Sequence, residues 1–142
     1  MSKKYTLITG ASSGIGKSTA ELFASKGKNL ILIARGGEAL DEVKSEINAK
    51  YPELDIVTRD YDLTDIAGLN DLYDSFKEYN IETWINNAGF GILELVKDHS
   101  IDRVLNMIRL NVEALTVLSI RYVQDYANVD GTQLINISSG AG

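Results

Sequence analysis

The sequence has 142 residues, the size of one domain, and its 44% hydrophobic and 24% charged residues exclude a disordered chain. A net charge of −6 argues against general nucleic-acid binding and against a polybasic membrane-surface module, because both need a basic face. The chain has no cysteine and one histidine, which excludes disulfides, thiolate catalysis and a histidine-rich metal site, so we expect no metal site.

Short apolar runs alternate with longer amphipathic runs along the chain. The apolar runs predict strands at 5–8, 30–34, 55–61, 82–86 and 133–138. The amphipathic runs predict helices at 15–26, 38–51, 65–79 and 101–126. This alternation predicts an α/β fold in which right-handed crossovers build a parallel sheet with helices on both faces. Ligands of such sheets bind at the carboxyl ends of the strands.

No apolar run approaches the ~20 residues needed to span a bilayer. The N-terminal Met1-Ser2-Lys3-Lys4 leads straight into an apolar strand with no signal-peptide cleavage region. We therefore expect a cytoplasmic protein without membrane or nucleic-acid partners.

Three glycines lie between the first predicted strand and helix, in the run Thr9-Gly10-Ala11-Ser12-Ser13-Gly14-Ile15-Gly16. Glycine permits positive φ and lets another group approach the backbone closely. A helix N-terminus adds free N–H groups and a partial positive charge. Together these features predict a phosphate cradle. A tight turn whose glycines serve only packing is the less favoured alternative, because one glycine would suffice for a turn.

Gly16-Lys17-Ser18 also has the letters that end a P-loop, which would indicate a phosphotransferase. That motif needs a glycine five positions before Gly16, where Ala11 stands. It also needs an aspartate for magnesium at the end of a neighbouring strand, and the fourth predicted strand ends in Asn86-Asn87. We therefore interpret Lys17 as a solvated helix residue.

The spacing T-G-x-x-x-G-x-G instead resembles the glycine motif of the short-chain dehydrogenase/reductase family, a Rossmann-fold group. The resemblance implies a Rossmann-like doubly wound parallel sheet of five strands in the order 3-2-1-4-5. It implies that the family's C-terminal strands and helices are missing, so that residues 1–142 are the NADP-binding portion of a longer protein. The cofactor contacts that it implies in this turn are Thr9, Gly10, Ser12, Ser13, Gly14, Ile15 and Gly16.

Arg35 ends the second predicted strand, nineteen positions after Gly16. A carboxylate near this point binds the ribose of NAD, whereas an arginine accommodates the 2′-phosphate of NADP. One charge-assisted hydrogen bond contributes about 1.5–3 kcal/mol, enough to set the preference. We expect NADP, with NAD as the less favoured alternative. Ser13 stands where many NADP-preferring relatives carry a second basic residue, and its hydroxyl could still bind the phosphate.

The resemblance also assigns roles at the third and fourth strand ends. Asp62 and Leu63 match the turn that contacts adenine in the family, although a capping role for Asp62 is an equally favoured alternative. Asn87, Ala88 and Gly89 match the family's N-N-A-G motif, whose small residues let the ribose and nicotinamide approach.

Two residues match catalytic positions of the family. Asn111 interrupts an apolar helix face and matches an asparagine that binds a backbone carbonyl and holds a water in a proton relay. Ser139 matches the serine that orients the substrate carbonyl, with Ser138 as the fallback. The family's Tyr-x-x-x-Lys pair is not in its expected place. Tyr73 and Lys77 match it by letter but precede Asn87, so we interpret them as coincidence.

The expected function is an NADP-dependent oxidoreductase that interconverts a carbonyl and an alcohol by hydride transfer on a small-molecule substrate. The chain would carry only the cofactor half and be inactive alone. A non-catalytic dinucleotide-binding or sensing module is the alternative. The apolar residues of helix 101–126 and of strand 133–138 would lack a cover, which predicts further chain or a homo-oligomer formed through that helix.

Overall fold

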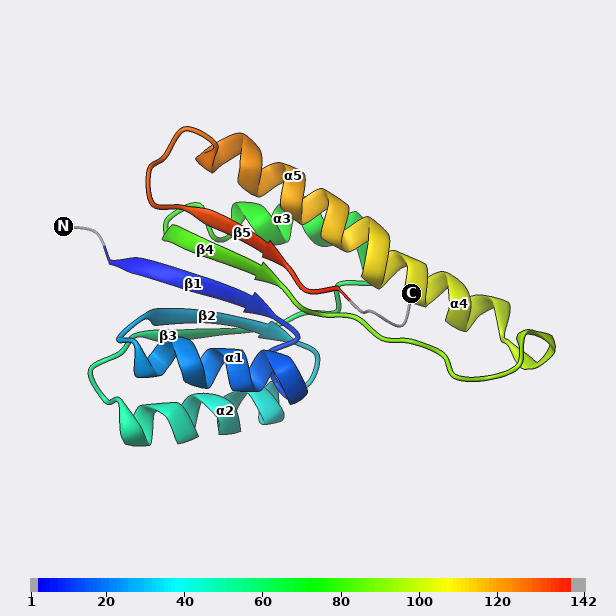
Figure 1. Ribbon diagram of the computed structural model, residues 1–142, viewed down its shortest axis with the longest axis horizontal. Helices are drawn as coiled ribbons and strands as arrows, with labels where there is room; N and C mark the ends of the chain where they lie inside the picture. The colour runs from blue at the N-terminus through cyan, green and yellow to red at the C-terminus, as the bar shows by residue number, and fades with distance from the viewer. Residues whose placement is uncertain (1–2, 139–142) are drawn as a thin grey trace.

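Five parallel strands form one sheet in the computed structural model, which describes residues 3–138 (Figure 1). The strands are β1 (Lys4–Thr9), β2 (Asn29–Ala34), β3 (Ile56–Asp60), β4 (Asn80–Asn86) and β5 (Gln133–Asn136). Their order, β3-β2-β1-β4-β5, confirms the predicted order. It reverses at β1, which pairs with β2 on one side and with β4 on the other. This reversal is the place where Rossmann-like folds bind ligands.

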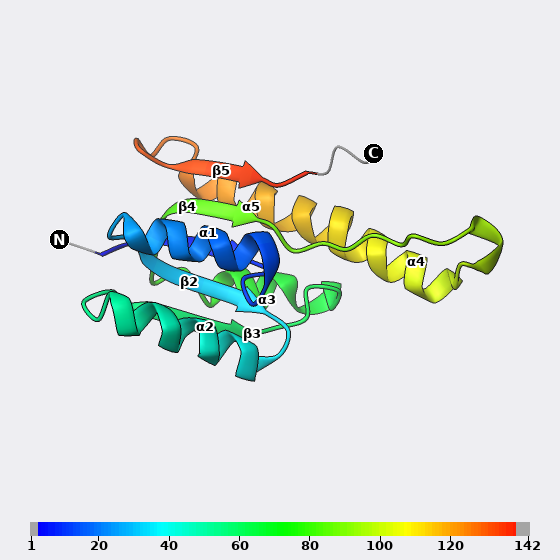
Figure 2. The same cartoon turned by 60° about the horizontal axis from the view of Figure 1, so that its bottom comes forward.

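Helices cover both faces of the sheet. The α-helices of the described residues are α1 (Gly14–Ser25), α2 (Gly37–Lys50), α3 (Leu69–Asp74), α4 (Ile101–Ile108) and α5 (Leu115–Tyr126), and all but α4 cover the sheet. Figures 1 and 2 show α1 and α2 on one face and α3 and α5 on the other. The fold is therefore a doubly wound α/β sheet, as predicted.

The two faces divide the core into two clusters. Successive side chains of a strand point to opposite faces. Ile8 and Leu32 accordingly pack with residues of α1 and α2, while Leu7 and Ile33 pack with residues of α3 and α5. Both sets are buried. This is why the β2 sequence is apolar without alternation.

The helix predicted over 65–79 is much shorter in the structure. The 3₁₀ turn Ile66–Gly68 precedes α3, which has six residues. After α3 the backbone amides donate hydrogen bonds to the carbonyl three residues earlier, as in a 3₁₀ turn. Phe76 bonds to Tyr73 in this way, and Lys77 bonds to Asp74. The Ser75 hydroxyl donates to the Leu72 carbonyl at 2.6 Å, a local bond that competes with regular helix.

The helix predicted over 101–126 is interrupted by a π-helical segment, Arg109–Ala114, between α4 and α5. Figure 1 shows α4 extending past the carboxyl ends of the strands, alongside the segment that follows β4. Because no strand lies under α4, its residues Ile101 and Leu105 are 77% and 41% exposed. In α5, Leu118 and Tyr122 are buried in the core.

Candidate functional site

The glycines of the β1–α1 turn face different surroundings. A Cβ on Gly16 would lie 2.1 Å from the carbonyl oxygen of Gly10, and one on Gly10 would lie 2.9 Å from Cα of Ala88. These two glycines therefore allow the turn to pack against α1 and the end of β4. Gly14 has φ of +55° and faces open space. The turn is thus packed on its inner side and open at Gly14.

The N-terminus of α1 leaves its first amides available. Ser13 is the N-cap residue, and its exposed side chain makes no capping hydrogen bond. First-turn amides have no partner within their own helix, and they attract anions. Lys17 does not join this group, because its ammonium lies 3.1 Å from Oε2 of Glu46 on α2. The arrangement fits a phosphate bound by backbone amides and supports our interpretation of Lys17 as a solvated residue.

Thr9 and Asn87 fasten the ends of β1 and β4 together. The Thr9 hydroxyl accepts hydrogen bonds from the amides of Asn87 and Ala88, both at 2.9 Å. The Asn87 side chain donates to the carbonyls of Thr9 at 3.2 Å and Gly10 at 3.3 Å. Thr9 is only 1% exposed. The Thr9 side chain therefore fastens the end of β1 to the residues after β4. Its direct contact with the cofactor stays a prediction.

Asn86 connects β4 to the elements on its far side. Its side-chain oxygen accepts from the Trp84 indole at 3.0 Å, and its amide donates to Ser119 of α5 at 3.1 Å and to Asn136 of β5 at 3.0 Å. A buried amide with all these partners makes a rigid junction. The first asparagine of N-N-A-G is therefore structural, while the second faces the glycine turn.

Asn111 lies in the π-helical segment and binds the loop after β4. Its amide donates to the Phe90 carbonyl at 2.8 Å, and its oxygen accepts from the Phe90 amide at 3.1 Å. The oxygen would lie 2.9 Å from a Cβ on Gly89, so glycine fits closely there. The expected apolar face around Asn111 is only partly buried, because Ile108 and Val112 are exposed while Ala114 lies in the core. The bond to a carbonyl is present, and the proton-relay role stays a prediction.

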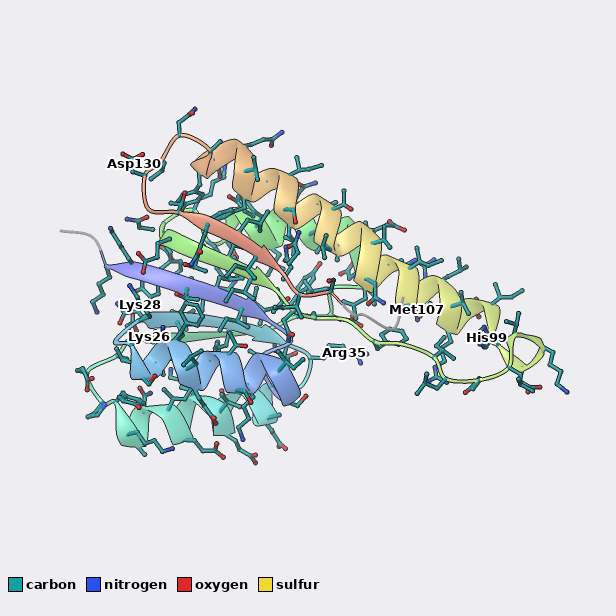
Figure 3. All side chains as sticks on the ribbon, in the orientation of Figure 1. Lys26, Lys28, Arg35, His99, Met107 and Asp130 are labelled. Carbon is teal, nitrogen blue, oxygen red and sulfur yellow. The ribbon has the colours of Figure 1, made fainter. Side chains whose placement is uncertain are left out.

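Arg35 lies at the carboxyl ends of the strands, in the turn before α2 (Figure 3). Within residues 3–138 its guanidinium makes no ion pair within 4.0 Å. Asp62 is close enough for the charge of Arg35 to act on it. Partial burial raises the pKa of Asp62, but hydrogen bonds from the Thr64 hydroxyl and amide, together with Arg35, outweigh it and leave the pKa below its usual value. Arg35 is thus an exposed cation at the predicted phosphate position.

The turn after β3 shows one of the two roles considered for Asp62, the local cap. Its Oδ1 accepts from the Thr64 hydroxyl at 2.8 Å and from the Thr64 amide at 3.0 Å, which is a local cap. Leu63 is 5% exposed, and its side chain packs in the core. The adenine contacts of Asp62 and Leu63 stay predictions.

Asp60 makes a contact that the sequence reasoning missed. Its carboxylate accepts from the amides of Gly36 and Gly37, each at 3.2 Å, and so caps α2 from the end of β3. The two glycines were a usable signal, because a helix that starts Gly36-Gly37 has no side chain of its own to cap it.

The remaining sequence candidates lie elsewhere. Ser139 is outside the described residues, and Ser138 is exposed. Tyr73 is buried against Trp84, and its hydroxyl donates to Asp125 at 2.8 Å. Burial, and to a smaller extent this hydrogen bond, raises the pKa of Tyr73. A catalytic tyrosine needs a lowered pKa. Lys77 lies 3.8 Å from Asp74. The letter match is therefore not a catalytic pair.

No helix within residues 3–138 is both long and apolar enough to cross a membrane. The same residues contain no group of three or more histidine, cysteine, aspartate or glutamate side chains placed to hold a metal ion.

The reversal at β1, the open glycine turn and the polar strand ends define a Rossmann-like α/β protein with a dinucleotide-type site. Comparison with known families agrees, since the short chain dehydrogenase family model matches residues 4–142. The chain belongs to this family of oxidoreductases, which confirms the resemblance found in the sequence.

Individual relatives give the range of similarity. The chain is 35% identical over 143 residues to an NADP-dependent 3-hydroxy acid dehydrogenase of Schizosaccharomyces pombe, covering 98% of this chain and 55% of that protein. It is 32% identical over 144 residues to a very-long-chain 3-oxoacyl-CoA reductase of Caenorhabditis briggsae, covering 96% of this chain and 45% of that protein. The chain thus spans about half the length of these relatives.

Solved structures show the same fold. An alcohol dehydrogenase from Comamonas testosteroni specific for bulky-bulky ketones has a TM-score of 0.89 at 31% identity, covering 96% of this chain and 55% of its own. A short-chain dehydrogenase from Sphingobium yanoikuyae, solved with NADPH, has a TM-score of 0.88 at 31% identity, covering 97% of this chain and 54% of its own.

Proposed function

We propose that residues 1–142 form the NADP-binding portion of an oxidoreductase that interconverts a carbonyl and an alcohol on a small molecule. The observation that carries this proposal is Arg35, an exposed cation in the turn after β2 that has no ion-pair partner among residues 3–138. In Rossmann-like folds a residue near this point contacts the adenosine ribose. Two relatives support the proposal: one is an NADP-dependent dehydrogenase, and the other is a dehydrogenase solved with NADPH.

Different residues of the site would bind different parts of the cofactor. The first-turn amides of α1 would bind the pyrophosphate at Gly14, with the Ser12 and Ser13 hydroxyls as further donors. Arg35 would bind the 2′-phosphate. Asn87, Ala88 and Gly89 would border the nicotinamide end, where Asn111 holds the adjoining loop. A nicotinamide cofactor, when bound, supplies or accepts the hydride, and the protein supplies its placement.

The catalytic roles follow the family positions. Ser139 would hydrogen-bond the carbonyl oxygen and stabilise developing negative charge, and Asn111 would hold a water for proton transfer. Because Tyr73 and Lys77 lie on the flank of the sheet, we expect residues 1–142 to bind cofactor but not to oxidise NADPH by themselves. Cofactor binding without turnover in the protein at its natural length would favour the alternative, a non-catalytic dinucleotide-binding or sensing module.

Self-association belongs to the same proposal. Residues 101–126 expose Ile101, Leu105 and Val112, which form an apolar face of the kind that protein partners cover. A cytoplasmic location and the absence of nucleic-acid partners stay predictions from the sequence.

The test is a comparison of NADPH and NADH dissociation constants for the natural protein and for Arg35→Asp. Loss of the charge-assisted bond should weaken NADPH binding roughly ten- to a hundredfold and change NADH binding much less. Lys26→Asp is the control, because Lys26 lies at the opposite end of the sheet (Figure 3). An unchanged preference in Arg35→Asp would show that Arg35 does not bind the phosphate.

A further inference from the structure

The start of α2 has no capping side chain of its own. Gly36 is the N-cap residue at φ +88°, and Gly37 is the first helical residue. The amides of both bind the carboxylate of Asp60, one to each oxygen, at 3.2 Å. An anion at a helix N-terminus is stabilised by the helix dipole. Asp60 of β3 therefore supplies the anion at the N-terminus of α2.

Asp60, the last residue of β3, lies beside the β2–α2 turn that contains Arg35. In the pairing of β2 with β3, Asp60 is opposite Ala34, the residue before Arg35. Its side chain is exposed, so a ligand at this turn meets the carboxylate as well as the guanidinium. Asp62 differs, since its Oδ1 is engaged by Thr64 within the next turn. The turn thus presents one cation and one anion to the ribose end of a dinucleotide.

We propose that Asp60 is a second determinant of cofactor preference and that it acts against Arg35. This inference rests on the proposed function. The carboxylate occupies the two amides that a 2′-phosphate could otherwise use, and its charge repels the phosphate. Toward the 2′-hydroxyl of NAD the same carboxylate is an acceptor. The preference for NADP over NAD then depends on the balance between the attraction of Arg35 for the 2′-phosphate and the repulsion by Asp60.

Asp60 also caps α2, so the test needs a readout that capping alone does not move. That readout is the ratio of the NADH to the NADPH dissociation constant, measured with the protein at its natural length. Asp60→Asn removes the charge and keeps one acceptor oxygen for an amide. Asp60→Glu keeps the charge. Asp41→Asn removes a charge from an exposed position further along α2 and is the matched control.

We expect the ratio to rise about fivefold in Asp60→Asn, the effect of losing one screened repulsion. It should stay within about twofold of the natural protein in Asp60→Glu and in Asp41→Asn. If thermal unfolding shows that Asp60→Asn does not fold, Asp60→Ser replaces it, because serine supplies a neutral capping oxygen.

The outcomes separate the two proposals. An unchanged ratio in the folded neutral variant, or equal weakening of both cofactors, means that Asp60 is only a cap and overturns this inference alone. A natural protein that binds neither dinucleotide overturns the proposed function, and this inference with it.

Discussion

Two glycines of the β1–α1 turn, Gly14 and Gly16, are required for different reasons. Gly16 is needed because its neighbours leave no room for a side chain, whereas Gly14 is needed because of its backbone conformation. The sequence motif treats the two alike. Only the distances to Gly10 and Asn87 show that Gly16 serves packing and that Gly14 borders the open space.

This difference predicts unequal costs for the same substitution. In Gly16→Ala the new Cβ would meet the Gly10 carbonyl, so the β1–α1 junction must open, and the free energy of unfolding should fall by at least about 2 kcal/mol. In Gly14→Ala the new Cβ meets nothing, and the positive φ should cost about 1 kcal/mol. Urea unfolding of both variants checks this. Equal stability of the two variants would contradict the assignment.

The elements show where local pattern and tertiary contact disagree. The apolar spacing of residues 101–126 is that of one helix, and the chain there is indeed helical. The π-helical segment Arg109–Ala114 contains Asn111, whose amide pairs with both backbone groups of Phe90. Such segments are frequent at functional sites. The interruption therefore accompanies the contact that joins this helix to the loop after β4.

That contact predicts a local effect of Asn111→Ala. The substitution frees the Phe90 amide and carbonyl, so hydrogen exchange at residues 87–91 should speed up while the sheet stays protected. Global stability should fall by no more than about 1 kcal/mol, because the freed groups can bind water. Asn106→Ala is the control, since Asn106 accepts a bond only from Arg109 among the side-chain contacts of the described residues. Unaltered hydrogen exchange at Phe90 would show that the Asn111 side chain does not hold this loop.

At the scale of the whole molecule, buried tyrosines hydrogen-bond to residues far from them in the sequence. Tyr5 on β1 donates to Asp55, and Tyr122 on α5 donates to the Ile81 carbonyl at 2.8 Å. Burial, reinforced at Tyr5 by the bond to Asp55 and at Tyr122 by the charge of Tyr126, raises the pKa of each to about 12. Both phenols are therefore neutral in the folded protein at pH values where the unfolded chain already ionises.

This arrangement predicts alkaline unfolding. Because the folded pKa of each phenol lies above its unfolded value near 10, the stabilisation is complete below pH 10 and is lost as pH rises through about 12. Urea unfolding across this range, together with tyrosinate absorbance, measures the loss. Tyr122→Phe should be less stable at neutral pH but show a weaker fall above pH 10. An equally steep fall would rule out Tyr122 as a contributor.

The sequence by itself determined the class of fold, and it predicts where the site lies. Apolar runs and amphipathic spacing depend on neighbours in the chain, so they predicted each strand and most helices. The glycine motif around Gly14 and the N-N-A-G run that contains Asn87 indicated the family, which the comparison confirmed.

Tertiary structure alone decided the short α3, the exposure of Asn111 and the cap that Asp60 places on α2. These features arise from contacts between residues far apart in sequence. Asp60 and Gly36 are separated by 24 positions, and only the pairing of β2 with β3 brings them together. Local periodicity carries no information about such pairs, because it reports which face of an element is apolar and not which residue lies opposite it.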